Sequence, residues 1–205
     1  EQLSFDPLAG TRHLLTLCQN PGGFTAEEIQ AFADELSGEI WPKARATEME
    51  FHCQAFQKYL HEWFQLSFEL TPQEVELEFW KSAYDSRPTG GILELLKPLA
   101  RMGIPTAVLS NTTHSEKTLR YELARWGLEP YFRFVIATAE YVHRKPSPRI
   151  FRLAARKIGG RDIFYAGDKI EFDVLGASRA GMKALWYNPK GAAPSLPGLS
   201  YLEVS

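Results

Sequence analysis

The stretch 163–181 reads IFYAGDKIEFDVLGASRAG, and it combines a short apolar run, a glycine, an acidic turn and a helical pattern. The run 163–166 predicts a buried strand, and 172–181 predicts a helix. Ligands of open parallel sheets bind beyond the carboxyl ends of the strands. The carboxylates that follow this strand therefore lie where we expect a functional site.

The same alternation extends outward from this stretch over the second half of the chain. Short apolar runs that alternate with capped helical patterns indicate βαβ units and a parallel sheet. We therefore predict an α/β fold. Its expected strands are 106–109, 132–137, 163–166 and 184–187, and its expected helices are 91–102, 113–127, 148–158 and 172–181.

The chain before Arg87 has a different texture, which predicts four helices and no strand. The start signals are a proline cap at Asp6-Pro7 and capping boxes at Thr25-Glu28 and Thr71-Glu74, and the apolar positions of the remaining helix fall within 49–63. We therefore predict a mainly helical subdomain over residues 1–87 and the α/β part over 88–205.

The composition is that of an ordinary globular chain. Its 205 residues are 44% apolar and 23% charged, which excludes disordered and collagen-like classes. A net charge of −2 gives no global field that would hold nucleic acid or an anionic membrane, so neither is an expected partner. No apolar run approaches the ~18 residues of a membrane span, and no segment resembles a signal peptide. Cys18 and Cys53 belong to no zinc-spaced cluster, so we expect a reduced, cytoplasmic protein.

Hydroxyl and amide side chains follow the predicted strand 106–109. Ser110 and Asn111 come directly after it, and Thr113 is the expected N-cap of the next helix. Backbone amides at a helix N-terminus favour an anion, and hydroxyls can donate to its oxygens. The structural alternative is that Thr113 only caps the helix and Ser110 only satisfies a local backbone group.

A basic loop follows the next strand. Lys145 lies there between Arg144 and Pro146. A lysine held at this place can neutralise a carboxylate or a phosphoryl oxygen. The alternative is an ordinary solvated loop.

Three acidic residues follow the strand 163–166, namely Asp168, Glu171 and Asp173. Carboxylates in such a turn suit Mg²⁺, which prefers oxygen ligands. They also suit a helix N-terminus that binds no metal. A hydroxyl, a lysine and carboxylates at one sheet edge are, taken together, the groups needed to hold a phosphate and its Mg²⁺.

These segments resemble three motifs of one known family. AVLSNT (107–112), RKPSPRIF (144–151) and YAGDKIEFDVLGASRAGM (165–182) are similar to motifs II, III and IV of the haloacid dehalogenase superfamily of hydrolases. Lys145 lies 35 residues after Ser110, and Asp168 lies 23 residues after Lys145, as that family leads us to expect. The resemblance implies a Rossmann-like three-layer α/β core with a parallel sheet, and an α-helical cap of the C1 type over residues 1–87.

The resemblance also implies a reaction and a set of roles. An aspartate would attack phosphorus, and the aspartyl-phosphate would then be hydrolysed with the help of Mg²⁺. Ser110 and Asn111 would bind the phosphoryl group, and Lys145 would pair with its charge and with the nucleophile. Asp168 would ligate Mg²⁺ directly, and Asp173 would act on the metal or on its waters. The expected function is hydrolysis of a small phosphorylated metabolite.

Two alternatives stay open. A 2-haloacid dehalogenase is the nearest one, although dehalogenases of the family need no metal and usually carry uncharged polar residues where Asp168 stands. A catalytically inactive binding or scaffold protein of the same fold is the other. Lys169 and Phe172 depart from the serine and asparagine that are common in motif IV, which leaves the surroundings of the metal less defined.

No segment matches the first motif of the family, an apolar strand followed by Asp-x-Asp-x-Thr. Asp6, Gly10 and Thr11 give Asp-x-x-x-Gly-Thr, which is one residue too long, and Asp6-Pro7 is typical of a helix start. That strand belongs in the middle of the sheet, where it would be a continuous apolar run. We therefore expect the strand and its nucleophilic aspartate to precede Glu1.

The helical part offers further candidates. In the family, the cap closes over the site and selects the substrate. Four residues around the start of the third helix could face the phosphate site, namely Trp41, Arg45, Glu48 and His52. The alternative is that Trp41 lies in the core and the other three lie on a solvated helix face. The aromatic residues of 51–68 are expected to form the core of this part and a homodimer face. His13, His61 and His114 have no partner that the sequence shows.

Overall fold

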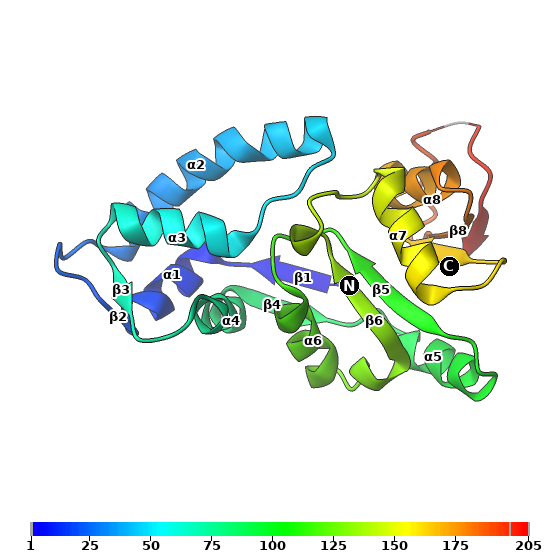
Figure 1. The fold of residues 1–205 in the computed structure, drawn as a ribbon, viewed down its shortest axis with the longest axis horizontal. Helices are drawn as coiled ribbons and strands as arrows, with labels where there is room; N and C mark the ends of the chain where they lie inside the picture. Colours follow the sequence, from blue (N-terminus) through cyan, green and yellow to red (C-terminus); the bar gives the residue numbers. More distant parts are fainter. Residues whose placement is uncertain (1, 197, 205) are drawn as a thin grey trace.

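A computed structural model of the chain describes residues 2–196 and 198–204. Figure 1 shows helices gathered at one end of the molecule and parallel strands with their helices at the other. The helices at the first end are α1 (Pro7–Leu15), α2 (Ala26–Thr47), α3 (Cys53–Trp63) and α4 (Pro72–Ala83). No helix within the described ranges is long and apolar enough to cross a membrane.

The predicted helix starts of the first part are confirmed. The Asp6 side chain accepts a hydrogen bond from the Ala9 amide and so caps α1. Both capping boxes form, with Thr25 and Glu28 at the start of α2 and Thr71 and Glu74 at the start of α4. Each box satisfies amides that the first helical turn leaves without partners.

The prediction that this part contains no strand was wrong. Strand β1 (Gln2–Phe5) pairs antiparallel with β4 (Tyr84–Arg87), so that Phe5 lies opposite Tyr84 and their rings stack with centroids 4.5 Å apart. A second short pair joins β2 (Cys18–Gln19) to β3 (Ser67–Phe68). The partners in each pair are far apart in sequence, and a four-residue strand has no local pattern that reveals its partner.

The predicted parallel strands are confirmed. Strands β5 (Thr106–Ser110) and β6 (Phe132–Ala137) pair in parallel, as do β7 (Phe164–Gly167), β8 (Lys183–Tyr187) and the unpredicted β9 (Leu202–Val204). The chain therefore has the expected α/β fold. The division at Arg87 into a cap and a core remains a prediction.

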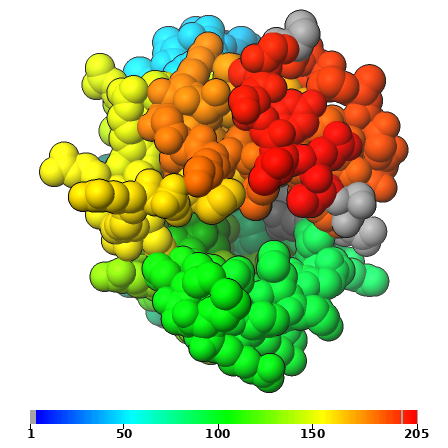
Figure 2. Space-filling view, turned by 90° about the vertical axis from the view of Figure 1, so that its right-hand side faces the viewer, coloured from blue at the N-terminus to red at the C-terminus, as the bar shows by residue number. Residues whose placement is uncertain are grey.

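These strands form two separately hydrogen-bonded sheets, β5–β6 and β7–β8–β9, where a single sheet was expected. Figure 2 shows one face on which the green part of the chain lies below and its yellow to red part lies above, with a hollow between them. The Tyr165 hydroxyl crosses from β7 to the Leu109 carbonyl of β5 over 3.2 Å. One core cluster contains residues of both sheets, among them Leu109, Ile136 and Trp186. The central strand expected from the resemblance remains a prediction.

Helices surround the strands as predicted, with two corrections at their ends. The helices are α5 (Ile92–Arg101), α6 (Glu116–Arg125), α7 (Pro148–Ile158) and α8 (Leu175–Arg179), with 3-10 turns at Glu129–Tyr131 and Thr138–Glu140. Ser115 caps α6, because its side chain accepts from the Thr118 amide, so the expected cap at Thr113 was wrong. A π-helical turn, Ile170–Val174, precedes α8 and starts the helix two residues earlier than expected.

We expect Gly38→Ala to stabilise the protein. Gly38 lies inside α2, and an added Cβ would meet no atom within 4 Å. Alanine at such a helical position should raise the free energy of unfolding by about 0.5–1 kcal/mol, measured as a higher urea midpoint at an unchanged slope. Gly23→Ala is the matched control of opposite sign. Gly23 is equally uncrowded but has a φ of +67°, which strains any L side chain.

Candidate functional site

A buried lysine lies at the carboxyl end of β7. The Lys145 ammonium lies 2.6 Å from Asp173 Oδ1 and 3.0 Å from the Tyr165 hydroxyl, and the side chains of Lys145 and Asp173 are only 12% and 4% exposed. The Tyr165 hydroxyl also lies 3.1 Å from Asp173 Oδ1. An ammonium, a carboxylate and a phenol therefore meet at the edge where the sequence predicted the site.

The protonation states follow from these contacts. Burial disfavours the charged ammonium, but Tyr165 and Asp173 outweigh it and raise the pKa of Lys145 above its usual value. Burial raises the pKa of Tyr165 despite the neighbouring ammonium. Lys145 is therefore a fixed cation, and Tyr165 keeps its proton. The hydroxyl can donate to Asp173 or to the Leu109 carbonyl.

Asp173 is held over the end of β7 by backbone groups. Its Oδ2 accepts a hydrogen bond of 3.0 Å from the Lys169 amide. A Cβ at Gly167 would lie 2.3 Å from the Asp173 carboxyl carbon, which is closer than real Cβ atoms approach. Glycine is thus required at position 167 because the Asp173 carboxylate occupies the space of its missing side chain.

Asn111 positions the loop that carries Lys145. Its Nδ2 donates to the Lys145 carbonyl over 3.0 Å, and its Oδ1 accepts from the Lys145 amide over 2.7 Å. The amide group of Asn111 is therefore engaged with backbone at both ends. Ser110, the last residue of β5, is half-buried beside it. The structure thus brings Asn111, Lys145 and Asp173 together, and Ser110 directly precedes Asn111 at the end of β5.

Asp168 lies at the rim of this group. It follows β7 directly, its side chain is 58% exposed, and its Oδ2 lies 3.0 Å from the Lys169 ammonium. Asp168 and Asp173 supply hard oxygen donors at the same strand end, the donor type that Mg²⁺ prefers. Asp168 is exposed enough to exchange its lysine partner for a cation. Asp168 and Asp173 are thus the residues of this edge that could supply carboxylate oxygens to Mg²⁺.

Two further features were not predicted. Nothing in the sequence singled out Tyr165, because an aromatic residue in a strand normally indicates core packing. The segment 48–50 is also tied to the loop before Lys145, since the Glu50 amide donates to the Val142 carbonyl and the Arg144 amide donates to the Glu48 carbonyl. Arg144 is buried, with Nη1 3.6 Å from Glu50 Oε1.

The helical candidates have different positions. Trp41 is half-buried between Arg144 and Arg45, whose guanidinium carbons lie 5.3 and 5.9 Å from its ring. Glu48 pairs with Arg179 at 3.3 Å, and His52 caps α3 by accepting from the Gln54 amide. Trp41 and Glu48 therefore both reach Arg144, next to Lys145, Trp41 through its ring and Glu48 through its carbonyl.

Comparison with known proteins decides the family. The model of the haloacid dehalogenase-like hydrolases matches residues 19–187. The chain belongs to this family. The predicted resemblance is thereby confirmed, and the strand-end lysine and carboxylates described above lie within the matched residues.

Relatives of this haloacid dehalogenase-like hydrolase include several phosphatases. It is 33% identical over 99 residues to a glyceraldehyde 3-phosphate phosphatase of Methanopyrus kandleri, covering 47% of this chain and 41% of that protein. It is 30% identical over 117 residues to a pyrimidine 5′-nucleotidase of Escherichia coli, covering 53% of this chain and 51% of that protein. The chain thus spans about half or less of the length of these relatives.

Solved structures of the family share the fold. A 2-haloacid dehalogenase of Pseudomonas syringae aligns over 100% of this chain and 90% of its own, with a TM-score of 0.66 and 22% identity. A HAD-hydrolase of Bacillus subtilis described as bound to magnesium aligns over 98% of this chain and 89% of its own, with a TM-score of 0.56 and 17% identity. At these identities the likeness concerns the fold alone.

Proposed function

We propose that this haloacid dehalogenase-like hydrolase is a Mg²⁺-dependent phosphatase of a small phosphorylated metabolite. The main support is the Lys145 ammonium, buried against Asp173 at the strand end that Asp168 follows. A fixed cation next to two carboxylates provides the charges needed to hold a phosphoryl group and a divalent metal. The phosphatases among the relatives agree with this function.

Each residue has a role in this proposal. Ser110 donates to a phosphoryl oxygen, and Asn111 fixes the loop of Lys145. Lys145 neutralises charge on the phosphoryl group. Asp168 and Asp173 hold Mg²⁺, which supplies charge neutralisation when bound. The helices α1–α4 form the cap that selects the substrate.

Parts of the proposal rest on the resemblance alone. Among the described residues, Asp173 is the one aspartate that contacts the Lys145 ammonium, and Asp6 caps α1. The nucleophilic aspartate and its aspartyl-phosphate therefore remain predictions, as do a homodimer and a cytoplasmic location. A dehalogenase is the less favoured function, because it has no use for the carboxylate of Asp168 next to the strand end.

Removal of the metal tests the proposal. We expect hydrolysis of p-nitrophenyl phosphate to stop in EDTA and to return with Mg²⁺. Asp168→Asn should lower kcat/KM by at least about 100-fold, because it removes a metal ligand. Glu171→Gln is the matched control, since Glu171 lies in the same acidic turn but bonds to Ser195. Turnover that ignores EDTA, or release of halide from a 2-haloacid in place of phosphate release, would contradict the proposal.

Gly167→Ala should impair the same reaction without touching a charged group. The added Cβ displaces the Asp173 carboxylate from above β7. A displacement of about 1 Å in such a site costs roughly 100-fold in rate, which initial rates on p-nitrophenyl phosphate will show. Gly38→Ala, at an uncrowded position inside α2, is the control that should retain wild-type rates. Wild-type activity of Gly167→Ala would show that the position of Asp173 does not matter.

A further inference from the structure

A second group of metal-ligating side chains lies on the other side of the β5–α6 connection. His52 and Cys53 stand at the start of α3, Glu76 lies on α4, and His114 lies in the loop between β5 and α6. We propose that these four residues form a binding site for a thiophilic divalent cation of the zinc class. The site is separate from the Mg²⁺ site at β7 and shares no residue with it.

The distances around His114 Nδ1 match those expected between the ligands of a tetrahedral ion. Cys53 Sγ lies 3.4 Å from His114 Nδ1, and the same Nδ1 lies 3.5 Å from Glu76 Oε1. Ligand atoms of His52, Cys53 and Glu76 all lie within 4.8 Å of one another. Zinc bonds of about 2.0–2.1 Å to nitrogen and 2.3 Å to sulfur place tetrahedral ligand atoms roughly 3.3–3.6 Å apart. Two edges of the expected tetrahedron are thus already present.

The arrangement of His114 favours a metal over a catalytic relay. In a relay, the nucleophile and the carboxylate bind opposite nitrogens of the imidazole. Here the thiol and the carboxylate both face Nδ1, while Nε2 lies 3.3 Å from the Tyr84 hydroxyl. A group that accepts from the outer nitrogen is the usual support of a metal-binding histidine, because it fixes the tautomer. Tyr84 is in that position.

Charge and burial point to a cation in the same place. Glu76 is fully buried, and His114 is 4% exposed. The Glu76 side chain accepts hydrogen bonds from the Ser115 amide over 2.7 Å, from the Ser115 hydroxyl over 2.9 Å and from Gln54 over 2.6 Å. Within the described ranges, no lysine or arginine pairs with Glu76. The carboxylate of Glu50 is also fully enclosed, but it faces Arg144. A divalent ion would neutralise the charge of Glu76.

The chemistry of binding balances with one proton. An ordinary cysteine thiol carries its proton near neutral pH, so Cys53 has to release one when the ion binds. When the ion binds, the S–H bond breaks, a sulfur–metal bond forms, and the proton passes to solvent. His114 offers the lone pair of Nδ1 and keeps its ring proton on Nε2, where the Tyr84 oxygen can accept it. Binding through Cys53 and His114 therefore moves protons and changes no oxidation state.

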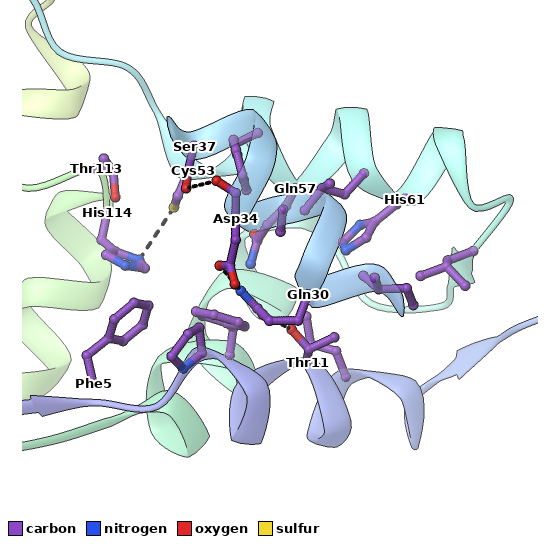
Figure 3. A pocket seen from close by; sticks show the side chains of 18 of the residues that line it. Phe5, Thr11, Gln30, Asp34, Ser37, Cys53, Gln57, His61, Thr113 and His114 are labelled. Atoms are coloured by element: carbon purple, nitrogen blue, oxygen red, sulfur yellow. Dashed lines mark hydrogen bonds between the residues drawn. The ribbon is translucent and has the colours of Figure 1, made fainter. Parts of the chain in front are cut away.

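The ion also has a route to the site. Cys53 and His114 line a cavity of about 200 Å³ between the helices, and Figure 3 shows their side chains pointing toward one another at its edge. Polar groups of Thr11, Gln30 and Asp34 line the same cavity. A bound ion would join α3 and α4 to the β5–α6 loop, a connection that the hydrogen bond from the Cys53 amide to the Thr113 carbonyl already begins.

Titration with Co²⁺, a spectroscopic substitute for Zn²⁺, tests the proposal on the whole protein. We expect a thiolate-to-cobalt absorption band that saturates at one equivalent, with visible bands of four-coordinate Co²⁺, and complete displacement by one equivalent of Zn²⁺. Cys53→Ser and His114→Ala should each abolish the thiolate band or lower Zn²⁺ affinity by at least about 100-fold. Tyr84→Phe should lower the affinity by about 10-fold to 100-fold, because it removes the support of Nε2.

Three variants distinguish this site from the second thiol, from the Mg²⁺ site and from a loss of folding. Cys18→Ser should retain the band, since Cys18 is the other thiol and lies in β2. Asp168→Asn should also retain it, because Asp168 belongs to the Mg²⁺ site. The circular dichroism of Cys53→Ser, a nearly isosteric change, should match wild type. No band in the wild type, or a band that survives Cys53→Ser, would overturn the proposal.

Discussion

Replacing Lys145 with alanine should lower kcat/KM for p-nitrophenyl phosphate by about 1,000-fold, the effect of removing one preorganised group that stabilises transition-state charge. The ammonium is buried 2.6 Å from Asp173, so neither water nor another lysine can replace it. Steady-state rates at saturating Mg²⁺ measure the effect. Lys145→Gln, which keeps a donor and loses the charge, should be impaired to a similar degree if charge is what matters.

Lys169→Ala is the matched control for Lys145. Lys169 lies on the same edge, but its side chain is 62% exposed and pairs with the exposed Asp168. Its backbone amide, which holds Asp173, is unchanged by the substitution. We expect less than about a 10-fold change in rate, because a solvent-exposed pair contributes little. Equal losses in Lys145→Ala and Lys169→Ala would contradict a special role of the buried ammonium.

Glu122→Ala should destabilise the protein by about 3 kcal/mol, since it leaves several buried donors without an acceptor. The buried carboxylate of Glu122 accepts from the Trp80 indole over 3.2 Å and from Ser86 and Arg125. It thus connects α6 to α4 and β4. Urea unfolding measures the loss. Glu62→Ala, which removes an exposed pair with Lys58, should change the stability by less than about 0.5 kcal/mol.

The same carboxylate makes stability depend on pH. Although burial opposes ionisation, Arg125, Ser86 and Trp80 lower the pKa of Glu122 below its usual value of 4.5. A group with a lowered pKa stabilises the folded state above its unfolded pKa and loses that effect as the pH falls through its folded pKa. The difference in unfolding free energy between wild type and Glu122→Ala should therefore shrink below about pH 4.5. A constant difference down to acid pH would contradict this assignment.

Local signals predicted much of the fold. The capping boxes at Thr25 and Thr71 and the strand 132–137 are determined by residues close together in sequence. A short window of sequence was therefore enough to predict them. The pair β1–β4 was missed because it depends on partners about eighty positions apart, which no window of sequence contains. The cap of α6 was misplaced by two residues because Thr113 and Ser115 are both good caps, and only the geometry of the loop selects Ser115.

The candidate site was predicted in its members and less well in its contacts. Lys145 was expected to pair with a nucleophile, and in the structure it pairs with Asp173. In the structure the amide group of Asn111 holds the loop of Lys145, and its expected contact with the phosphate stays a prediction. The group around His114 could not be predicted, since Cys53 and His114 are 61 positions apart and match no zinc spacing. Such groups arise from packing of helices, which sequence spacing does not record.

The antiparallel pair β1–β4 brings the two ends of the helical group together. Residues 6–83 leave one strand of the pair and return to the other, so the two ends of this segment are neighbours, about 4.8 Å apart across the ribbon. An exchanged segment has to meet that spacing and the contacts that residues 48–53 and Glu76 make with the loops before Lys145 and before α6. Evolution or a designer can therefore transplant the whole helical group between relatives as a module, leaving the strand-end chemistry in place beneath it.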